Sequence, residues 1–137
     1  MKHSLDLALI GNCQVGALID TQAEIVWYCL PRFDGDPVFC SLLQEHEPGE
    51  GIGYCGIELV DQVASEQHYL PNSAVLVTTM TDSRGGAVEV TDFAPRFRQY
   101  GRIFTPIMLV RQLRRLHGTP RVVVRVRPAR NYGAERG

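Results

Sequence analysis

The chain has 137 residues, of which 45% are hydrophobic and 21% charged, and its formal net charge at pH 7 is −1. These values exclude a disordered or fibrous protein, and a chain of this length buries about 68% of its unfolded surface, enough for one domain with a core. No apolar run approaches the ~20 residues that a membrane-spanning helix needs.

Charge is divided unevenly along the chain. Residues 1–93 hold fourteen acids and three bases, a net of −11, whereas residues 94–137 hold eleven arginines and one acid, a net of +10. Such a split is found in proteins with a basic nucleic-acid-binding arm. It also fits two halves of one fold that neutralise each other. We favour the second interpretation because the basic half has the apolar alternation of strands.

The N-terminus and the cysteines indicate where the protein works. The sequence starts MKHSLDLALIG, in which Asp6 interrupts a short apolar region, so we expect no signal peptide. The four cysteines contain no Cys-x-x-Cys pair: Cys13, Cys29, Cys40 and Cys55. We therefore expect reduced, mostly buried thiols and a cytoplasmic location.

Short apolar stretches that alternate with polar residues recur between Gly, Pro and Asn turn signals. The first has Leu5, Leu7 and Leu9 on one face, which we expect to be half-buried. Together they predict strands at residues 5–9, 15–19, 24–29, 52–59, 63–69, 74–81, 87–93, 107–116 and 122–126.

The remaining segments are less regular. Residues 38–43 follow a proline and predict one or two helical turns. Residues 94–105 are expected to be irregular. Residues 107–116 also fit a helix, but the Gly-Thr-Pro that follows and the alternating valines at 122–126 favour a strand in a hairpin. The sequence thus predicts an all-β protein, an antiparallel β-sandwich with one or two helical turns, as a single domain over residues 1–137.

One stretch, residues 25–43, places charged residues on a tight loop after an apolar strand. The strand holds the only tryptophan, Trp27, which we expect to pack into the core. The loop carries four candidate site residues: Arg32, Phe33, Asp34 and Asp36. Charged loops held by a rigid scaffold are where proteins present working surfaces.

The same stretch, WYCLPRFD at positions 27–34, resembles a signature of the N-terminal domain of glucoamylase- and trehalase-like enzymes in glycoside hydrolase family 15. Further matches follow in the family's order: Tyr69-Leu70-Pro71-Asn72-Ser73, Thr91-Asp92-Phe93-Ala94-Pro95, Leu109-Val110-Arg111, Pro128 and Asn131-Tyr132-Gly133. One departure is that Gly35-Asp36-Pro37 follows where the family more often has Ser-Pro, so the loop tip is one residue longer.

The resemblance implies a non-catalytic support domain. In that family the acid and base are glutamates of a separate (α/α)6 barrel, which hydrolyses α-glucosidic bonds with inversion in maltooligosaccharides, trehalose or a related glucan. No stretch of this chain is similar to the barrel, and family members continue with more strands of the same sandwich. The resemblance therefore implies a domain truncated at Gly137, an absent catalytic partner, and self-association through uncovered edges.

Three interpretations of the loop remain open. Asp34 and Asp36 could form the carboxyl pair of a glycosidase, although carboxylates two positions apart on such a loop more often cap turns. Alternatively, Arg32 and Phe33 contact the catalytic barrel near its active-site mouth. The third is that Arg32 pairs locally with Asp34 and only shapes the turn.

Other patterns give weaker signals. The histidines lack metal-ligand spacing, and Glu45-His46-Glu47 is expected to be a solvated loop, so we expect no metal and no cofactor. The GxGxxG spacing at residues 51–56 lacks the strand-then-helix context of a phosphate loop. Cys40 could be a nucleophile only if its thiol were activated.

The arginines of the C-terminal half favour a rival function. Arg111, Arg115, Arg125 and Arg127 could share a basic face that meets phosphates, although few aromatic residues lie among them for base stacking. Three classes of function thus remain. They are a glycosidase support domain, a stand-alone carbohydrate- or protein-binding sandwich, and, less favoured, a nucleic-acid-binding module.

Overall fold

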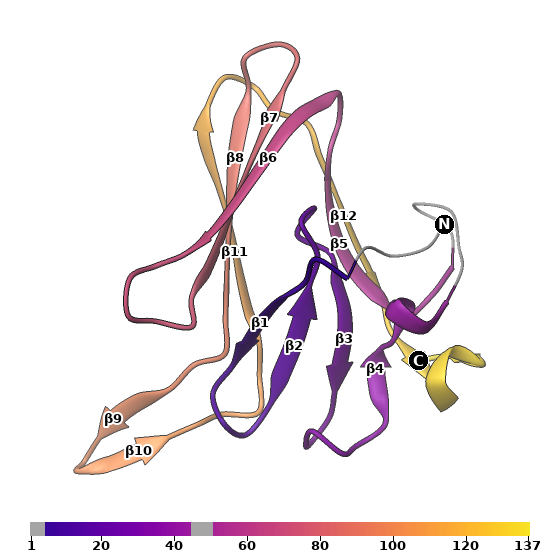
Figure 1. The fold of residues 1–137 in the computed structure, drawn as a ribbon, viewed down its shortest axis with the longest axis vertical. Helices are drawn as coiled ribbons and strands as arrows, with labels where there is room; N and C mark the ends of the chain where they lie inside the picture. Colours follow the sequence, from indigo (N-terminus) through magenta and orange to yellow (C-terminus); the bar gives the residue numbers. More distant parts are fainter. Residues whose placement is uncertain (1–4, 45–50) are drawn as a thin grey trace.

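The computed structural model describes residues 5–44 and 51–137 as two antiparallel β-sheets that face each other (Figure 1). The all-β prediction is confirmed, and helical structure is confined to two short 3-10 turns in the part of the chain described. No helix in that part has the length and apolar character needed to cross a bilayer.

The first sheet collects the N-terminal strands and one strand from the C-terminal half. Its order is β1-β2-β3-β5-β12, with β4 paired to β3 beside β5. The strands are β1 (Ala8–Gly11), β2 (Gly16–Ile19), β3 (Ile25–Cys29), β4 (Pro37–Phe39), β5 (Tyr54–Leu59) and β12 (Val122–Arg127). The 3-10 turn η1 (Ser41–Leu43) follows β4, so in the predicted helical segment 38–43 only the last three residues are helical, whereas residues 38 and 39 belong to β4.

The second sheet has the order β11-β8-β7-β6. Its strands are β6 (Gln62–Tyr69), β7 (Leu76–Asp82), β8 (Ala87–Phe93) and β11 (Val110–His117). Two small hairpin-like pairs complete the described fold. They are β9 (Phe97–Gln99) with β10 (Arg102–Phe104), and β13 (Ala129–Arg130) with β14 (Glu135–Arg136), between which lies η2 (Asn131–Gly133).

The core lies between the two large sheets. One cluster brings Ile57 and Leu59 of β5 against Met80 of β7 and Val88 and Val90 of β8. A second cluster joins the side chains of β1, β2 and β3 to Leu76 of β7. Burial of these apolar surfaces, worth about 25 cal/mol per Å² removed from water, provides the main attraction between the sheets.

Polar side chains close one side of the sandwich. Ser65, Gln67 and Tyr69 alternate along β6 and so point the same way, toward the first sheet. Ser65 Oγ donates to the carbonyl of Thr21 at 2.7 Å and Gln67 Nε2 to that of Asp20 at 2.9 Å. The Tyr69 hydroxyl donates to the Leu9 carbonyl at 2.8 Å and accepts from the Leu9 amide at 3.0 Å. We call these three residues the polar seam.

The opposite side is open. Val124 and Val126 of β12 lie opposite Ile57 and Cys55, and Leu113 of β11 lies opposite Val90. Residues directly opposite each other in an antiparallel pair point to the same face, so these three side chains face the interior. They are nevertheless 56%, 61% and 41% exposed, respectively. We call Leu113, Val124 and Val126 the open side.

Three predictions about the position or pairing of strands were wrong in detail. The first strand begins at Ala8, and its buried residue is Ile10, whereas Leu9 is 59% exposed. A slip of one residue reverses the faces of a strand, and the apolar run 7–10 allows either choice. Residues 94–105, expected to be irregular, contain the β9–β10 hairpin.

The third correction concerns β11 and β12, which do not form a hairpin together. β11 pairs with β8, and β12 pairs with β5 in the other sheet. Gly118, with φ +71°, starts the connection between the sheets, and a Cβ there would lie 2.7 Å from Gly86 Cα. The close approach of the two backbones explains why glycine occupies this crossing.

Candidate functional site

The loop between β3 and β4 is a compact turn at one end of the sandwich (Figure 1). The amide of Gly35 donates to the carbonyl of Arg32 at 3.0 Å, and the amide of Leu30 donates to that of Asp36 at 3.4 Å. A Cβ at Gly35 would lie 2.3 Å from the Leu30 carbonyl oxygen, so only glycine fits there. The loop is thus held in a single tight conformation by its own backbone.

Arg32 and Asp34 pair with each other at the tip of this loop. Arg32 Nε lies 3.2 Å from Asp34 Oδ1, and the two side chains are 71% and 74% exposed. Exposed pairs of this kind contribute about 0–1 kcal/mol, so the pair shapes the turn more than it stabilises the fold. Asp36 is also exposed. Neither carboxylate is enclosed by walls that could hold a sugar.

Neither Phe33 nor Trp27 is buried in the core. Phe33 is 58% exposed, and its ring edge covers Gly16 of β2, where a Cβ would lie 2.7 Å from Phe33 Cε1. Trp27, expected in the core, is half-buried although Val26 and Tyr28 beside it are buried. A register shift between β2 and β3 near Ile25 breaks the strict alternation of faces there.

The most polar group inside the fold is the pair formed by Asp92 of β8 and Arg111 of β11. Arg111 Nε lies 2.6 Å from Asp92 Oδ1 and Arg111 Nη2 lies 3.1 Å from Asp92 Oδ2, a two-pronged contact. Arg111 also donates to the carbonyl of Cys55 at 2.9 Å and to that of Ala23. One guanidinium therefore bonds to both sheets at once.

Electrostatics at this pair follow from its burial. The Asp92 side chain is fully buried and that of Arg111 is 13% exposed. Burial raises the pKa of Asp92, and the Arg111 guanidinium opposes that rise. Burial also acts to lower the pKa of Arg111, but the hydrogen bonds and charge of Asp92 outweigh it, so the pKa of Arg111 is raised. Each charge is compensated by the other, as a buried ion pair requires.

Glu24, in the turn before β3, has the most perturbed carboxyl group described. Burial raises its pKa to about 7, the charge of Asp20 adds to the rise, and Ser41 and Arg111 oppose it. Ser41 Oγ lies 3.5 Å from Glu24 Oε1. A carboxyl with such a pKa could serve as an acid. Glu24, however, lies beside the Asp20 turn and near Arg111, which joins the sheets, and it does not line the pocket described below.

Asn12 in the β1–β2 turn makes every hydrogen bond that its side chain allows. Its Nδ2 donates to the carbonyls of Pro95 and Pro106, both at 2.9 Å. Its Oδ1 accepts from the amides of Gln14 and Val15 at 3.0 and 3.1 Å. With its side chain buried, Asn12 ties the β1–β2 turn to both ends of the segment that carries β9 and β10.

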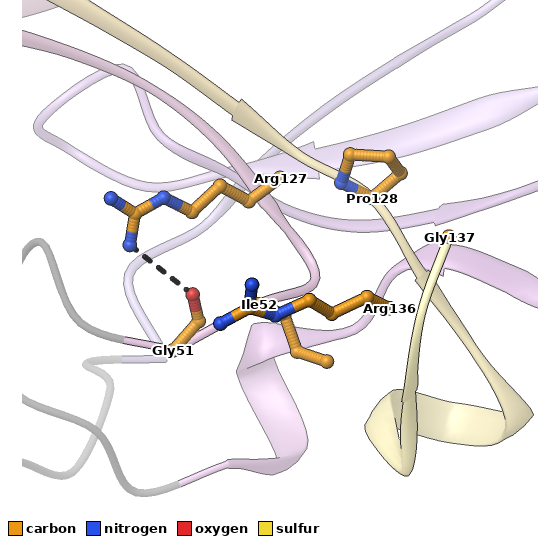
Figure 2. Close-up of a pocket in the computed structure, with 6 residues that line it drawn as sticks. All are labelled: Gly51, Ile52, Arg127, Pro128, Arg136 and Gly137. Carbon is orange, nitrogen blue, oxygen red and sulfur yellow. Dashed lines mark hydrogen bonds between the residues drawn. The ribbon is translucent and has the colours of Figure 1, made fainter.

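A shallow pocket of about 320 Å³ lies at the C-terminal end of β12 (Figure 2). It is lined by Gly51, Ile52, Arg127, Pro128, Arg136 and Gly137. Arg127 Nη1 donates to the Gly51 carbonyl at 3.4 Å. Because no carboxylate is among these lining residues, the pocket does not offer the acid and base of a glycosidase.

The other candidates from the sequence do not converge on a site. No group of three or more His, Cys, Asp or Glu residues is arranged for a metal ion in the part of the chain described, and Glu45-His46-Glu47 lies outside it. The GxGxxG spacing leads into β5 and not into a helix. Burial, followed by the charge of Cys29, raises the pKa of Cys40, which argues against a reactive thiolate.

Three arginines of the C-terminal half pair with acids of the N-terminal half. Besides Arg111 with Asp92, Arg114 pairs with Glu89 at 2.9 Å and Arg125 pairs with Glu58. These pairs favour the interpretation that the two halves of the chain neutralise each other's charge, rather than the interpretation that the arginines form a phosphate-binding face. Sequence reasoning singled out Arg111 for the wrong surface, and it missed Asn12 and Glu24 because nothing local distinguishes them from ordinary turn residues.

Comparison with known proteins finds a matching family profile and similar curated proteins. A family profile described as "Trehalase-like, N-terminal" matches residues 4–136. Similar curated proteins include a trehalase of Thermoplasma volcanium, 30% identical over 129 residues, and a trehalase of Mycolicibacterium smegmatis, 27% identical over 141 residues. Each alignment covers 93% of this chain and 20% of the relative.

A third relative, trehalase 1 of Sulfolobus acidocaldarius, is 37% identical over 91 residues, 65% of this chain and 15% of that protein. No solved structure matches significantly. The chain spans about one fifth of the length of the first two relatives. The profile match covers nearly every residue, from the first strand to the last, and on this ground the chain belongs to the trehalase-like N-terminal domain family.

Proposed function

We propose that this chain is the non-catalytic support domain of a trehalase-like enzyme of glycoside hydrolase family 15. The parent protein would hydrolyse an α-glucosidic bond with inversion, in trehalose, a maltooligosaccharide or a related glucan. Membership of the trehalase-like N-terminal family supports this proposal, as do relatives named trehalase that are about five times as long as the aligned segment.

The main support for a non-catalytic role is that Asp92 and Arg111 form a buried ion pair between strands. A glycosidase needs two carboxyl groups facing a sugar-sized site. Asp92 is fully buried and bound on both oxygens by Arg111, which in turn holds the backbone of the opposite sheet. The polar residues of two family motifs are thus committed to joining the sheets. We assign catalysis to a C-terminal (α/α)6 barrel of the full-length protein.

We further propose that the β3–β4 loop contacts this barrel near its active-site mouth. Arg32, Phe33, Asp34 and Asp36 are all exposed, whereas the backbone that carries them is tightly bonded. A rigid loop that presents an arginine and a phenylalanine has the composition of an interface anchor. Of these four side chains, Arg32 and Asp34 pair with each other at 3.2 Å.

The open side supports truncation within the domain. In a finished sandwich, inward-facing apolar residues are covered, yet Leu113, Val124 and Val126 face the interior and remain exposed. The outer edges of β11 and β12 end their sheets. Later strands of the full-length protein would pair with these edges. Without them, we expect two copies of this chain to cover the open side of each other.

A cytoplasmic location stays a prediction of the sequence. All four cysteines are free, and Cys29, Cys40 and Cys55 are buried. Burial, with the charges of Asp36 and Asp34, raises the pKa of Cys29. Buried thiols of this kind behave as small apolar side chains and fit a reducing compartment.

The test of this function uses the full-length protein encoded by the natural reading frame. We expect it to hydrolyse trehalose or an α-glucan, and the 137-residue chain alone to hydrolyse neither. Arg32→Ala and Phe33→Ala should lower kcat/KM of the full-length enzyme, whereas the matched change Arg84→Ala, in the turn between β7 and β8, should not. A reading frame that stops at Gly137, or sugar binding by the isolated chain, would instead select a stand-alone binding sandwich.

A further inference from the structure

The hairpin formed by β9 and β10 stands apart from both large sheets (Figure 1). All six of its strand residues are exposed, so neither face is covered within the described chain. On one face Phe97 and Phe104 stack on each other, with ring centroids 5.5 Å apart and 17° between the ring planes. A two-stranded ribbon is marginally stable in water unless it packs against something.

Tyr100 occupies the tip of this hairpin in an unfavourable backbone conformation. Its φ is +52°, and that of Gly101 is +71°. A two-residue turn with positive φ at both positions strongly prefers Asn-Gly, and a bulky residue in the first position costs stability. The Tyr100 side chain is 89% exposed, so contacts within the described chain do not offset this cost. An aromatic ring is therefore presented outward from a strained position.

The charge of the hairpin is of one sign. Residues 95–106 contain Arg96, Arg98 and Arg102 and no acidic residue. None of these arginines forms an ion pair in the part of the chain that the structure describes, although Arg114 and Arg125 elsewhere do. Arginine combined with Phe and Tyr is the composition enriched at protein interfaces.

The hairpin is nevertheless fixed in direction. Both of its ends are held by Asn12, whose Nδ2 donates to the Pro95 carbonyl on one leg and to the Pro106 carbonyl on the other. Asn12 is 2% exposed and fully hydrogen-bonded. Because both of its ends are anchored, the hairpin loses little conformational freedom when its exposed residues bind a partner.

We propose that the β9–β10 hairpin is a preorganised docking arm for the remainder of the same polypeptide. Tyr100 and the Phe97–Phe104 stack would enter an apolar pocket whose rim carries Asp and Glu side chains for the three arginines. The chain spans about one fifth of the length of two curated relatives, and a parent protein of that length would offer a large partner surface on the same polypeptide. The inference rests on the proposed function in this respect, because it requires a longer protein.

The first test is photo-crosslinking in the full-length protein. A photoreactive phenylalanine analogue at position 100 is expected to crosslink to a segment that follows residue 137 in the same chain. The same analogue at position 84, in the β7–β8 turn, is the matched control and should not crosslink there. Crosslinks only to residues 1–137, only to a second copy, or only to a bound glucan would overturn the proposal, as would none.

The second test separates docking from folding. Tyr100→Asn restores the favoured Asn-Gly turn, so the domain should fold at least as well, yet protection of the hairpin amides from hydrogen exchange in the full-length protein should fall about 30-fold, the loss typical of one interface anchor. Arg98→Glu with Arg102→Glu should have a similar effect, and Arg84→Glu should not. Unchanged hydrogen-exchange protection of the hairpin amides in the Tyr100→Asn and Arg98→Glu/Arg102→Glu variants would overturn the proposal of a docking arm.

Failure of the two proposals can be told apart. If the full-length protein hydrolyses α-glucosides but position 100 does not crosslink beyond residue 137, the docking arm is wrong and the support-domain function stands. If position 100 crosslinks to a later segment of a full-length protein that lacks glycosidase activity, the docking arm is supported and the proposed function fails.

Discussion

Arg111 and Asp92 lie directly opposite each other on β11 and β8, and the same guanidinium reaches across the interior to the carbonyls of Cys55 and Ala23. A side chain that is 13% exposed thus binds four acceptor oxygen atoms, which belong to the strands β8 and β5 and to the turn before β3. The sandwich is joined at this point by hydrogen bonds and not only by apolar contact. That arrangement makes the pair the best target for a stability test.

Arg111→Ala should lower the free energy of unfolding by about 3–5 kcal/mol, because it leaves the Asp92 carboxylate buried without a partner. Arg111→Lys should recover only part of this loss, since an ammonium cannot make the two-pronged contact. Urea denaturation monitored by Trp27 fluorescence measures both. As a control, Arg114→Ala removes an exposed pair with Glu89 and should cost about 0–1 kcal/mol. Equal effects at both positions would contradict the role given to Arg111.

Glu24 predicts a pH dependence of stability. Its pKa is about 7 in the folded chain and 4.5 for an ordinary glutamate, so the folded state binds the proton more tightly. Its favourable contribution is complete below about pH 4.5 and is lost as the pH rises to about 7. Glu24→Gln should therefore be more stable than the parent chain at about pH 8 and equal to it at about pH 4. Parallel stability profiles for the two proteins would contradict the assignment.

Asn12→Ala should destabilise the domain by about 1–3 kcal/mol, because it leaves buried backbone groups without partners. Asn12→Asp keeps the acceptor for the amides of Gln14 and Val15 but loses both donors to Pro95 and Pro106. We expect it to loosen the β9–β10 hairpin selectively, which hydrogen exchange can resolve. Uniform loss of protection over the whole domain would argue against selective anchoring.

Tyr69→Phe should weaken the polar seam by about 0.5–1.5 kcal/mol, since the hydroxyl makes two hydrogen bonds with Leu9 that water can partly replace. Faster hydrogen exchange should be confined to β1 and its neighbour β2. His68→Phe is a suitable control, because His68 directly precedes Tyr69 in β6 and lies on the opposite face. A change that spread to β11 would show that the seam is not local.

The isolated 137-residue chain should self-associate through its open side. Val124→Lys with Val126→Lys places charge on the uncovered inward face and should shift the sedimentation profile toward monomer. Val63→Lys is the matched control, because Val63 is 65% exposed but lies on β6, at the closed side. A monodisperse parent chain at high concentration would contradict the prediction.

The sequence predicted the strands well because alternation and turn residues are local signals. β2, β3, β6 and β8 lie within a residue or two of the expected ranges. It failed where a local pattern has two solutions: the run 7–10 could bury Leu9 or Ile10. Only the pairing of β1 with β2 and the contact of Leu9 with the Tyr69 hydroxyl decide between them. The Tyr100-Gly101 turn was missed because tyrosine is not a turn residue.

The candidate site was predicted in part. The exposure of Arg32, Phe33, Asp34 and Asp36 follows from their loop, which the Gly and Pro residues indicate. The roles of Asn12 and Arg111 could not be read from the sequence, because their partners lie far away in the chain. Alternation alone allowed Arg111 to lie on a basic face, and only the pairing of β11 with β8 puts it inside.

The distance along the chain between these partners has a consequence for synthesis. Asn12 bonds to residues 83 and 94 positions later, and Arg111 bonds to residues 56 and 88 positions earlier. Contacts of such separation slow folding, because a long loop must close before they form. While the chain emerges from the ribosome, the sheets can meet but cannot be locked until Arg111 has left the exit tunnel. A nascent chain stalled before that point would remain accessible to chaperones and proteases.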